Sequence, residues 1–121
     1  MKKIEFLVAG PLLGYRQTTK KSIFHPKERA RSQAYGAFKE RVLILSMAAG
    51  FPNMGSATKE HPPRLSVFLH WKGEPRIDWK NMYGSIEDAI FYQWDRYVIP
   101  GRHSGVAWDS GCEEAKVTVE W

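Results

Sequence analysis

The chain has 121 residues, of which 43% are hydrophobic, and its 18 lysines and arginines outnumber 13 acidic residues to give a net charge of +5. This length and apolar content indicate one folded domain and exclude a mainly disordered protein. The positive charge favours polyanionic partners such as nucleic acids.

Two features of the sequence predict the cellular compartment of the protein. Cys112 is the single cysteine, so no disulfide can form within the chain, and a reducing compartment is indicated. The N-terminal residues lack the charge and apolar pattern of a signal peptide or a membrane span. We therefore expect a cytoplasmic protein that does not enter membranes.

The first half of the chain contains one predicted strand and one long helix. Alternating apolar residues predict a strand at Lys3–Ala9, and a Gly-Pro pair ends it. We interpret the polar, basic residues 12–25 as a loose finger with a short return strand at 22–24. Proline suits the first position of a helix, so Pro26 predicts a helix over 27–49. Its predicted core-facing stripe comprises Ala34, Phe38, Val42, Leu45 and Ala49.

The second half of the chain predicts more strands around a second helix. In order, we expect a loop at 51–63, a strand at 64–71, a loop at 72–79, a helix at 85–97, a turn at 99–102, and a hairpin of strands 106–108 and 116–121 joined through 109–114. The order of elements predicts an α+β domain, a small mixed β-sheet with two main helices on one face. A single domain spans residues 1–121.

The start of the second helix is predicted from its capping residues. Ser85 has the side-chain oxygen of a good N-cap, and Asp88 follows at the spacing of a capping box. Ile86, Ala89 and Ile90 then fall on one apolar face. On this interpretation Asp88 has a structural role.

The segment before that helix carries a resemblance to a known family. The sequence reads RIDWKN at 76–81 and IEDAI at 86–90. It resembles the central motif of the RusA-type Holliday-junction resolvases, in which Asp-x-Asp-Asn-x-x-Lys leads into a helix ending Asp-Ala-Leu. Asp78 and Asn81 match this pattern, as does the Asp-Ala pair at 88–89. Lys80 stands in place of the second Asp, and Gly84 in place of the Lys.

The resemblance extends over nearly the whole chain, because the predicted elements come in the order of the RusA-like fold. It implies a homodimer that binds branched DNA at four-way junctions, and a Mg²⁺ ion held by several carboxylates. Asp78 is the candidate catalytic and metal-binding residue. However, residues 98–103 contain no acid where the family has an acidic pair. A lysine such as Lys80 about 4 Å from a divalent ion would repel it by several kcal/mol at an effective dielectric of roughly 20. We therefore expect junction binding without competent nuclease chemistry.

Basic residues are the candidate DNA-binding groups. They occur in the predicted finger, in the first turns of the long helix and in the family-like motif, where they can form one stripe along a phosphate backbone. An ordinary solvated surface is the alternative. The candidates are Arg16, Lys20, Lys21, Lys27, Arg29, Arg31 and Lys80.

Two other functions stay open. One is an active Mg²⁺-dependent junction nuclease with a rearranged site, which uses Asp78 together with Asp88 or Asp109. The other is a protein-interaction module that retains only the dimer scaffold. For Asp78 itself, the absent partner acids favour a structural role, as a cap or as a partner of Lys80. The acidic residues at 109, 113 and 114 are ordinary in a hairpin turn, and we do not expect them to approach Asp78.

Overall fold

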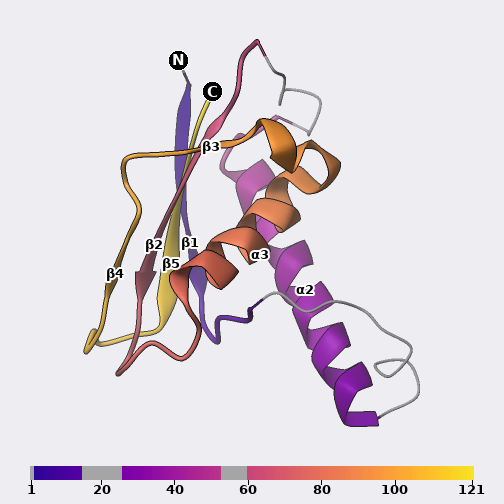
Figure 1. Cartoon of the computed structure of the whole chain (residues 1–121), viewed down its shortest axis with the longest axis vertical. Helices are drawn as coiled ribbons and strands as arrows, with labels where there is room; N and C mark the ends of the chain where they lie inside the picture. Colours follow the sequence, from indigo (N-terminus) through magenta and orange to yellow (C-terminus); the bar gives the residue numbers. More distant parts are fainter. Residues whose placement is uncertain (1, 15–25, 53–59) are drawn as a thin grey trace.

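A computed structural model describes residues 2–14, 26–52 and 60–121, without the side chains of Gln93 and Trp94. Most of the predicted finger, with Arg16, Lys20 and Lys21, lies outside the described residues. Figure 1 shows a sheet with helices packed on one side. In chain order the elements are β1 (Lys3–Ala9), α2 (Pro26–Ala48), β2 (Arg64–His70), α3 (Trp79–Phe91), the 3₁₀ helix η2 (Tyr92–Tyr97), β3 (Ile99–Pro100), β4 (Gly105–Ala107) and β5 (Glu114–Glu120).

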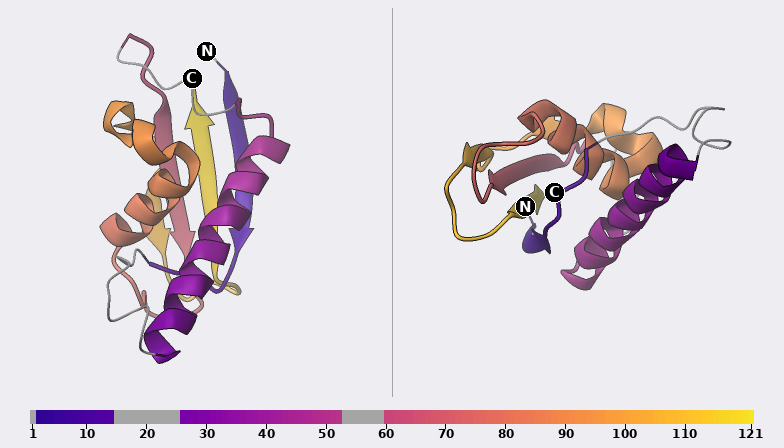
Figure 2. Two further views of the ribbon diagram at one scale, coloured as in Figure 1. Left: turned by 90° about the vertical axis from the view of Figure 1, so that its right-hand side faces the viewer. Right: turned by 90° about the horizontal axis from the view of Figure 1, so that it is seen from below.

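The five strands form one mixed sheet, which confirms the α+β prediction. The order is β1-β5-β2-β3, and β4 pairs with β2 further along the same edge. β5 is antiparallel to both β1 and β2, whereas β3 and β4 run parallel to β2. The views of Figure 2 place the helices on the same face of this sheet. None of the helices in the described ranges is long and apolar enough to cross a membrane.

The predicted C-terminal hairpin is wrong. β4 pairs with β2, and β5 inserts between β1 and β2. The reason lies in the burial of β5, in which Val117, Thr118 and Val119 are all nearly inaccessible to solvent. In the centre of the sheet, neighbouring strands on both sides shield these residues, so β5 gains more from a central position than from an exposed edge. The predicted turn at 99–102 likewise begins with the short strand β3.

The core lies between the sheet and the two helices. Ile4 and Val8 of β1, with alternate residues of β2 and β5, face helices α2 and α3. Helix α2 buries Tyr35, Phe38, Val42 and Ser46. The predicted stripe was therefore wrong at Ala34, which is exposed. A tyrosine removes more surface from water than an alanine, so the helix rotates to bury Tyr35.

The second helix begins earlier than predicted. Asp78 is its N-cap, and the helix runs from Trp79 to Phe91 before it tightens into η2. Ser85 is not a cap but a buried residue in mid-helix, where its hydroxyl donates to the carbonyl of Leu13 at 3.1 Å. The predicted capping box fails because Asp78 supplies the cap two turns earlier, and the helix tolerates Gly84 in its interior at a cost of about 1 kcal/mol.

Asp88 joins the two helices instead of capping one of them. Its carboxylate accepts from the Lys39 ammonium at 2.7 Å, and both side chains are partly buried. Burial would lower the pKa of Lys39, but the hydrogen bond and charge of Asp88 outweigh it and raise that pKa. The ion pair therefore fixes α2 against α3.

Glu87 occupies a different environment on the same helix. Burial first, and then the negative charge of Asp95, raise the pKa of Glu87 above its ordinary value of 4.5 to about 7, while a hydrogen bond with Tyr83 acts in the opposite direction. The folded chain thus holds this proton more tightly than the unfolded chain. By linkage, the contribution of Glu87 to stability falls as pH rises from about 4.5 to about 7.

Replacement of Glu87 by glutamine removes this loss. We expect Glu87→Gln to raise the free energy of unfolding at about pH 8 by about 1–2 kcal/mol, a value reduced from the full shift because the carboxyl is half exposed. Near pH 4.5 the variant and the parent have nearly equal stability, because the parent is then protonated. Urea unfolding of both proteins across this pH range measures the difference, and equal stability at pH 8 would contradict the assignment.

Candidate nucleic-acid interface

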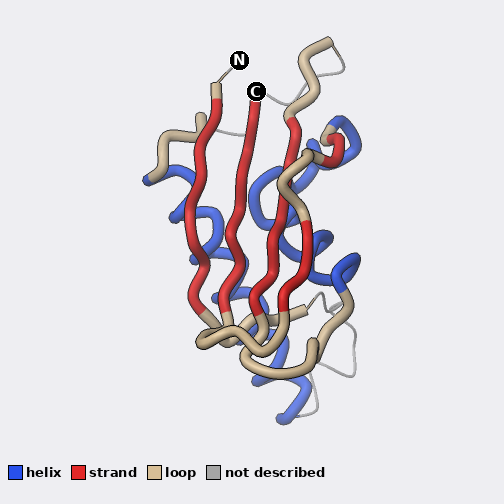
Figure 3. The backbone as a smooth tube through the Cα atoms, turned by 90° about the vertical axis from the view of Figure 1, so that its left-hand side faces the viewer, coloured by secondary structure: helices blue, strands red, loops and turns tan. Residues whose placement is uncertain are grey.

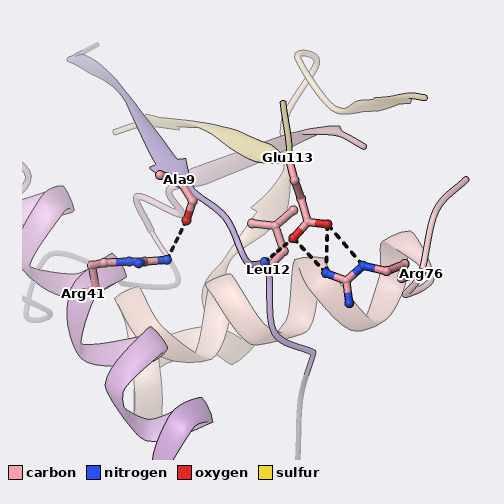
Figure 4. A network of polar contacts seen from close by, with 5 residues as sticks. All are labelled: Ala9, Leu12, Arg41, Arg76 and Glu113. Atoms are coloured by element: carbon pink, nitrogen blue, oxygen red, sulfur yellow. Dashed lines mark hydrogen bonds and ion pairs between the residues drawn. The ribbon is translucent and has the colours of Figure 1, made fainter. Parts of the chain in front are cut away.

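One carboxylate ties together three segments at the end of the sheet where β1 finishes. Figure 4 shows Glu113, just before β5, between the N-terminal segment and the loop that precedes α3. Its Oε2 accepts from the backbone N–H of Leu12 at 2.7 Å. The guanidinium of Arg76 donates to both carboxylate oxygens, at 2.8 Å each from Nη2. A charge-assisted bidentate pair of this kind fixes the orientation as well as the distance of Arg76.

A second arginine holds the neighbouring helix against the same corner. Arg41 of α2 donates from Nη2 to the carbonyl of Ala9 at 2.6 Å, where β1 ends (Figure 4). The N–H of Gly10 also donates to the backbone carbonyl of Glu113 at 2.8 Å. A side chain at Gly10 would approach that carbonyl to 2.7 Å, so glycine is required for this close packing.

A cleft of about 410 Å³ opens beside this network. It lies where the N-terminal segment, the first half of α2 and the start of α3 meet. This size is in the range of ordinary ligand sites. The lining residues are Leu12, Leu13, Gly14, Arg31, Ala34, Tyr35, Arg76, Ile77 and Asn81. Two guanidinium groups, from Arg31 and Arg76, thus line one cleft although they are distant in the sequence.

The motif residues Asp78 and Asn81 form the first turn of α3. Asp78 Oδ1 accepts from the backbone N–H of Asn81 at 2.7 Å, which is the ordinary N-cap bond. Asp78 itself is exposed, whereas Asn81 is half-buried at the cleft wall. Of the two structural roles expected for Asp78, the structure therefore shows the helix cap, which is made by Oδ1.

The other two motif positions are occupied by residues that do not complete an acidic site. Lys80 is exposed, and in the described part of the chain no ion pair joins it to Asp78. The suggested pairing of Lys80 with Asp78 is thus absent. Gly84 lies on α3 with open space beside its Cα.

The remaining candidate DNA-binding residues lie on the first turns of α2. Lys27, Arg29 and Arg31 are all exposed there. Arg31 makes a weak pair with Glu28 at 3.4 Å, an exposed contact that contributes little stability and leaves the guanidinium accessible. The structure brings only Arg31 of these three into the cleft beside the family-like motif.

The donor set for a divalent ion is incomplete compared with the family pattern. The described residues contain no group of three or more His, Cys, Asp or Glu side chains that can hold a metal. Among residues 76–81 Asp78 supplies the single carboxylate, and one of its oxygens is engaged in the helix cap. Asp88, further along the motif, is paired with Lys39. With one carboxylate oxygen left, most of the coordination shell of a Mg²⁺ ion would have to come from water and phosphate oxygens.

Glu113 and Arg76 are the site residues that the sequence analysis missed. Glu113 was assigned to an ordinary turn that does not approach Asp78, yet it binds Arg76, two positions before Asp78. The pair is separated by 37 residues in sequence, so no local spacing pattern could reveal it. Neither the family models nor the curated proteins include a match to this chain.

The cap at Asp78 has a measurable consequence. We expect Asp78→Ala to lower the free energy of unfolding by about 1 kcal/mol, because the N–H of Asn81 loses its partner. Asparagine is an equally good N-cap, so Asp78→Asn changes stability by only a few tenths of a kcal/mol. Denaturant unfolding of the two variants tests this difference. Equal losses in both would mean that the cap contributes nothing.

Proposed function

We propose that this protein is a homodimeric branched-DNA-binding protein with a RusA-like fold, which binds four-way junctions and lacks the nuclease chemistry of that family. The cleft carries the proposal, because it gathers Arg31 and Arg76 beside Asn81 of the family-like motif. The order of elements and the motif at 76–90 support the fold, and the role in recombination or repair follows from the family.

The charge around the cleft suits a phosphate backbone. Five cationic side chains line the cleft or lie close in sequence to residues that line it. The carboxylates in the same region are those of Glu28, Asp78 and Glu113. The cations are Lys27, Arg29, Arg31, Arg76 and Lys80. Arg76 is held in place by Glu113, so it enters binding already oriented. Phosphate contacts of this type fix the position of the protein and make its affinity fall with salt.

A dimer with two such clefts would prefer a junction to a linear duplex. A single cleft of about 410 Å³ accommodates only a short stretch of backbone. Two such clefts in a dimer would contact two arms together, and the second contact is then intramolecular and strengthens binding without new chemistry. A linear duplex cannot present two arms at the same angle.

Binding to a four-way junction is the first test. At moderate salt we expect the protein to bind a junction at least about tenfold more tightly than a linear duplex of the same sequence, with two chains per junction. The double variant Arg31→Gln/Lys80→Gln should weaken junction binding and reduce the slope of log K against log salt by about 2, close to one per lost phosphate contact. Fluorescence anisotropy over a salt series measures both quantities.

A matched control separates the cleft from the overall charge. Lys2→Gln/Arg96→Gln removes the same charge from two exposed residues, one at the opposite end of β1 and one in η2. It should leave most of the junction affinity intact. The proposal fails if the parent protein shows no preference for junctions, or if both double variants weaken binding equally.

Cleavage of the junction is the second test. Because Asp78 is the single carboxylate of residues 76–81 and Asp88 is paired with Lys39, we expect the junction to remain intact with and without Mg²⁺ in a denaturing-gel assay. Mg²⁺-dependent cutting by the parent protein that Asp78→Asn abolishes would contradict this expectation and favour a rearranged nuclease site. The Asp78→Asn variant is informative here because asparagine retains the helix cap.

A further inference from the structure

A second cavity lies on the face of the sheet that the helices leave uncovered. Figure 3 looks onto this face, with the helices behind the strands. The cavity has a volume of about 440 Å³. Because side chains alternate along a strand, Phe68 and His70 of β2 point here while Leu69 points into the core. Lys116 of β5 and Glu5 of β1 join them.

The cavity wall at the sheet edge is a short loop between β3 and β4, clamped onto β2. The N–H of Gly101 donates to the carbonyl of Leu65 at 2.8 Å, and that of His103 donates to Ser66 Oγ at 3.1 Å. Ser104 Oγ in turn accepts from the N–H of Val67 at 3.0 Å. These bonds hold Arg102 and His103 on a rigid support instead of a free loop.

Glycine at two positions permits this arrangement. A side chain at Gly101 would collide with Ser66 Oγ, and one at Gly105 would come within 2.6 Å of the Phe68 ring. The Phe68 ring therefore fits where it does because residue 105 has no side chain. It lies 5.0 Å from the His70 ring, at an interplanar angle of 42°.

The polar groups around the cavity favour an anion. Among the described residues that line the cavity, Glu5 is the one carboxylate, and it is already shared between Lys3 at 3.3 Å and Lys116 at 3.7 Å. These two lysines lower the pKa of Glu5, so its charge is balanced locally. Within the described residues the side chains of Arg102 and His103 form no hydrogen bond or ion pair. Both therefore have N–H donors available to a ligand.

We propose that this cavity binds the phosphate group of a nucleotide, with Arg102, His103 and Lys116 around the phosphate and the base packed against Phe68 and His70. Guanidinium and imidazole donors suit phosphate oxygens, and aromatic rings stack on any base. The same chemistry occurs in a free mononucleotide and at the end of a nucleic-acid strand. The site is on the other side of the sheet from the cleft, and it does not depend on the function proposed for that cleft.

Titration calorimetry of the full chain with AMP, adenosine and inorganic phosphate tests this site. We expect AMP to bind at least about tenfold more tightly than either fragment, because the phosphate and the base contribute together. Arg102→Gln should weaken AMP binding by about tenfold, the effect of one lost charge-assisted hydrogen bond. Arg96→Gln removes one exposed arginine from η2, and it should leave AMP binding unchanged.

Further variants distinguish a specific nucleotide site from a surface that binds anions through its positive charge alone. Gly105→Ala displaces the Phe68 ring and should weaken AMP binding without affecting inorganic phosphate, provided that circular dichroism shows an unchanged fold. If Gly105→Ala unfolds the chain, Phe68→Leu tests the same ring. Absence of AMP binding by the parent, or equal weakening in Arg102→Gln and Arg96→Gln, would overturn the proposal.

A short oligonucleotide distinguishes the two sources of phosphate. If the 5′-phosphorylated strand binds at least about tenfold more tightly than AMP and loses this gain when the 5′ end is a hydroxyl, the ligand is a strand end. Equal affinity for AMP and for the phosphorylated strand assigns the site to a free nucleotide. Loss of junction binding in the cleft variants has no bearing on either result, so the two proposals fail separately.

Discussion

The contacts of Glu113 are the interactions on which the end of the molecule with the cleft depends. The carboxylate accepts from the backbone N–H of Leu12 and from the guanidinium of Arg76. The backbone carbonyl of Glu113 also accepts from the N–H of Gly10. Because Glu113 directly precedes β5, the central placement of that strand determines where the carboxylate stands. The N-terminal segment and the loop before α3 are thereby held at one corner. Removal of Arg76 would leave the partly buried carboxylate of Glu113 without its charged partner.

Asp78 has a structural role at a position where the motif predicts a catalytic residue. Its Oδ1 begins helix α3 by accepting from Asn81, and this early start places Ser85 and Asp88 inside the helix. Ser85 then reaches Leu13, and Asp88 reaches Lys39. The cap is therefore the first step in a set of contacts that dock α3 against its surroundings. A carboxylate engaged in this way retains one oxygen for other partners.

The two faces of the sheet are organised by different means. Apolar packing against α2 and α3 covers one face, which carries most of the core. On the other face, the loop between β3 and β4 bonds to Ser66 and Val67 at the point where the edge pairing of β2 is interrupted. The carbonyl of Val67 accepts from the Trp79 indole at 2.9 Å, so both backbone groups of this residue are satisfied. The interruption in pairing thus makes room for Arg102 and His103.

Elements whose signals are local could be predicted from the order of the amino acids alone. Periodicity located β1, β2 and the long helix within a residue or two. Three features became clear only from the folded chain. β5 pairs between β1 and β2, α3 begins at the Asp78 cap, and Glu113 binds Arg76. Strand order and long-range ion pairs depend on burial summed over the whole sheet, and no short window of sequence contains that quantity. The motif at 76–90 therefore located the candidate site, whereas only the contact with Glu113, 37 residues away in the sequence, fixed the orientation of Arg76.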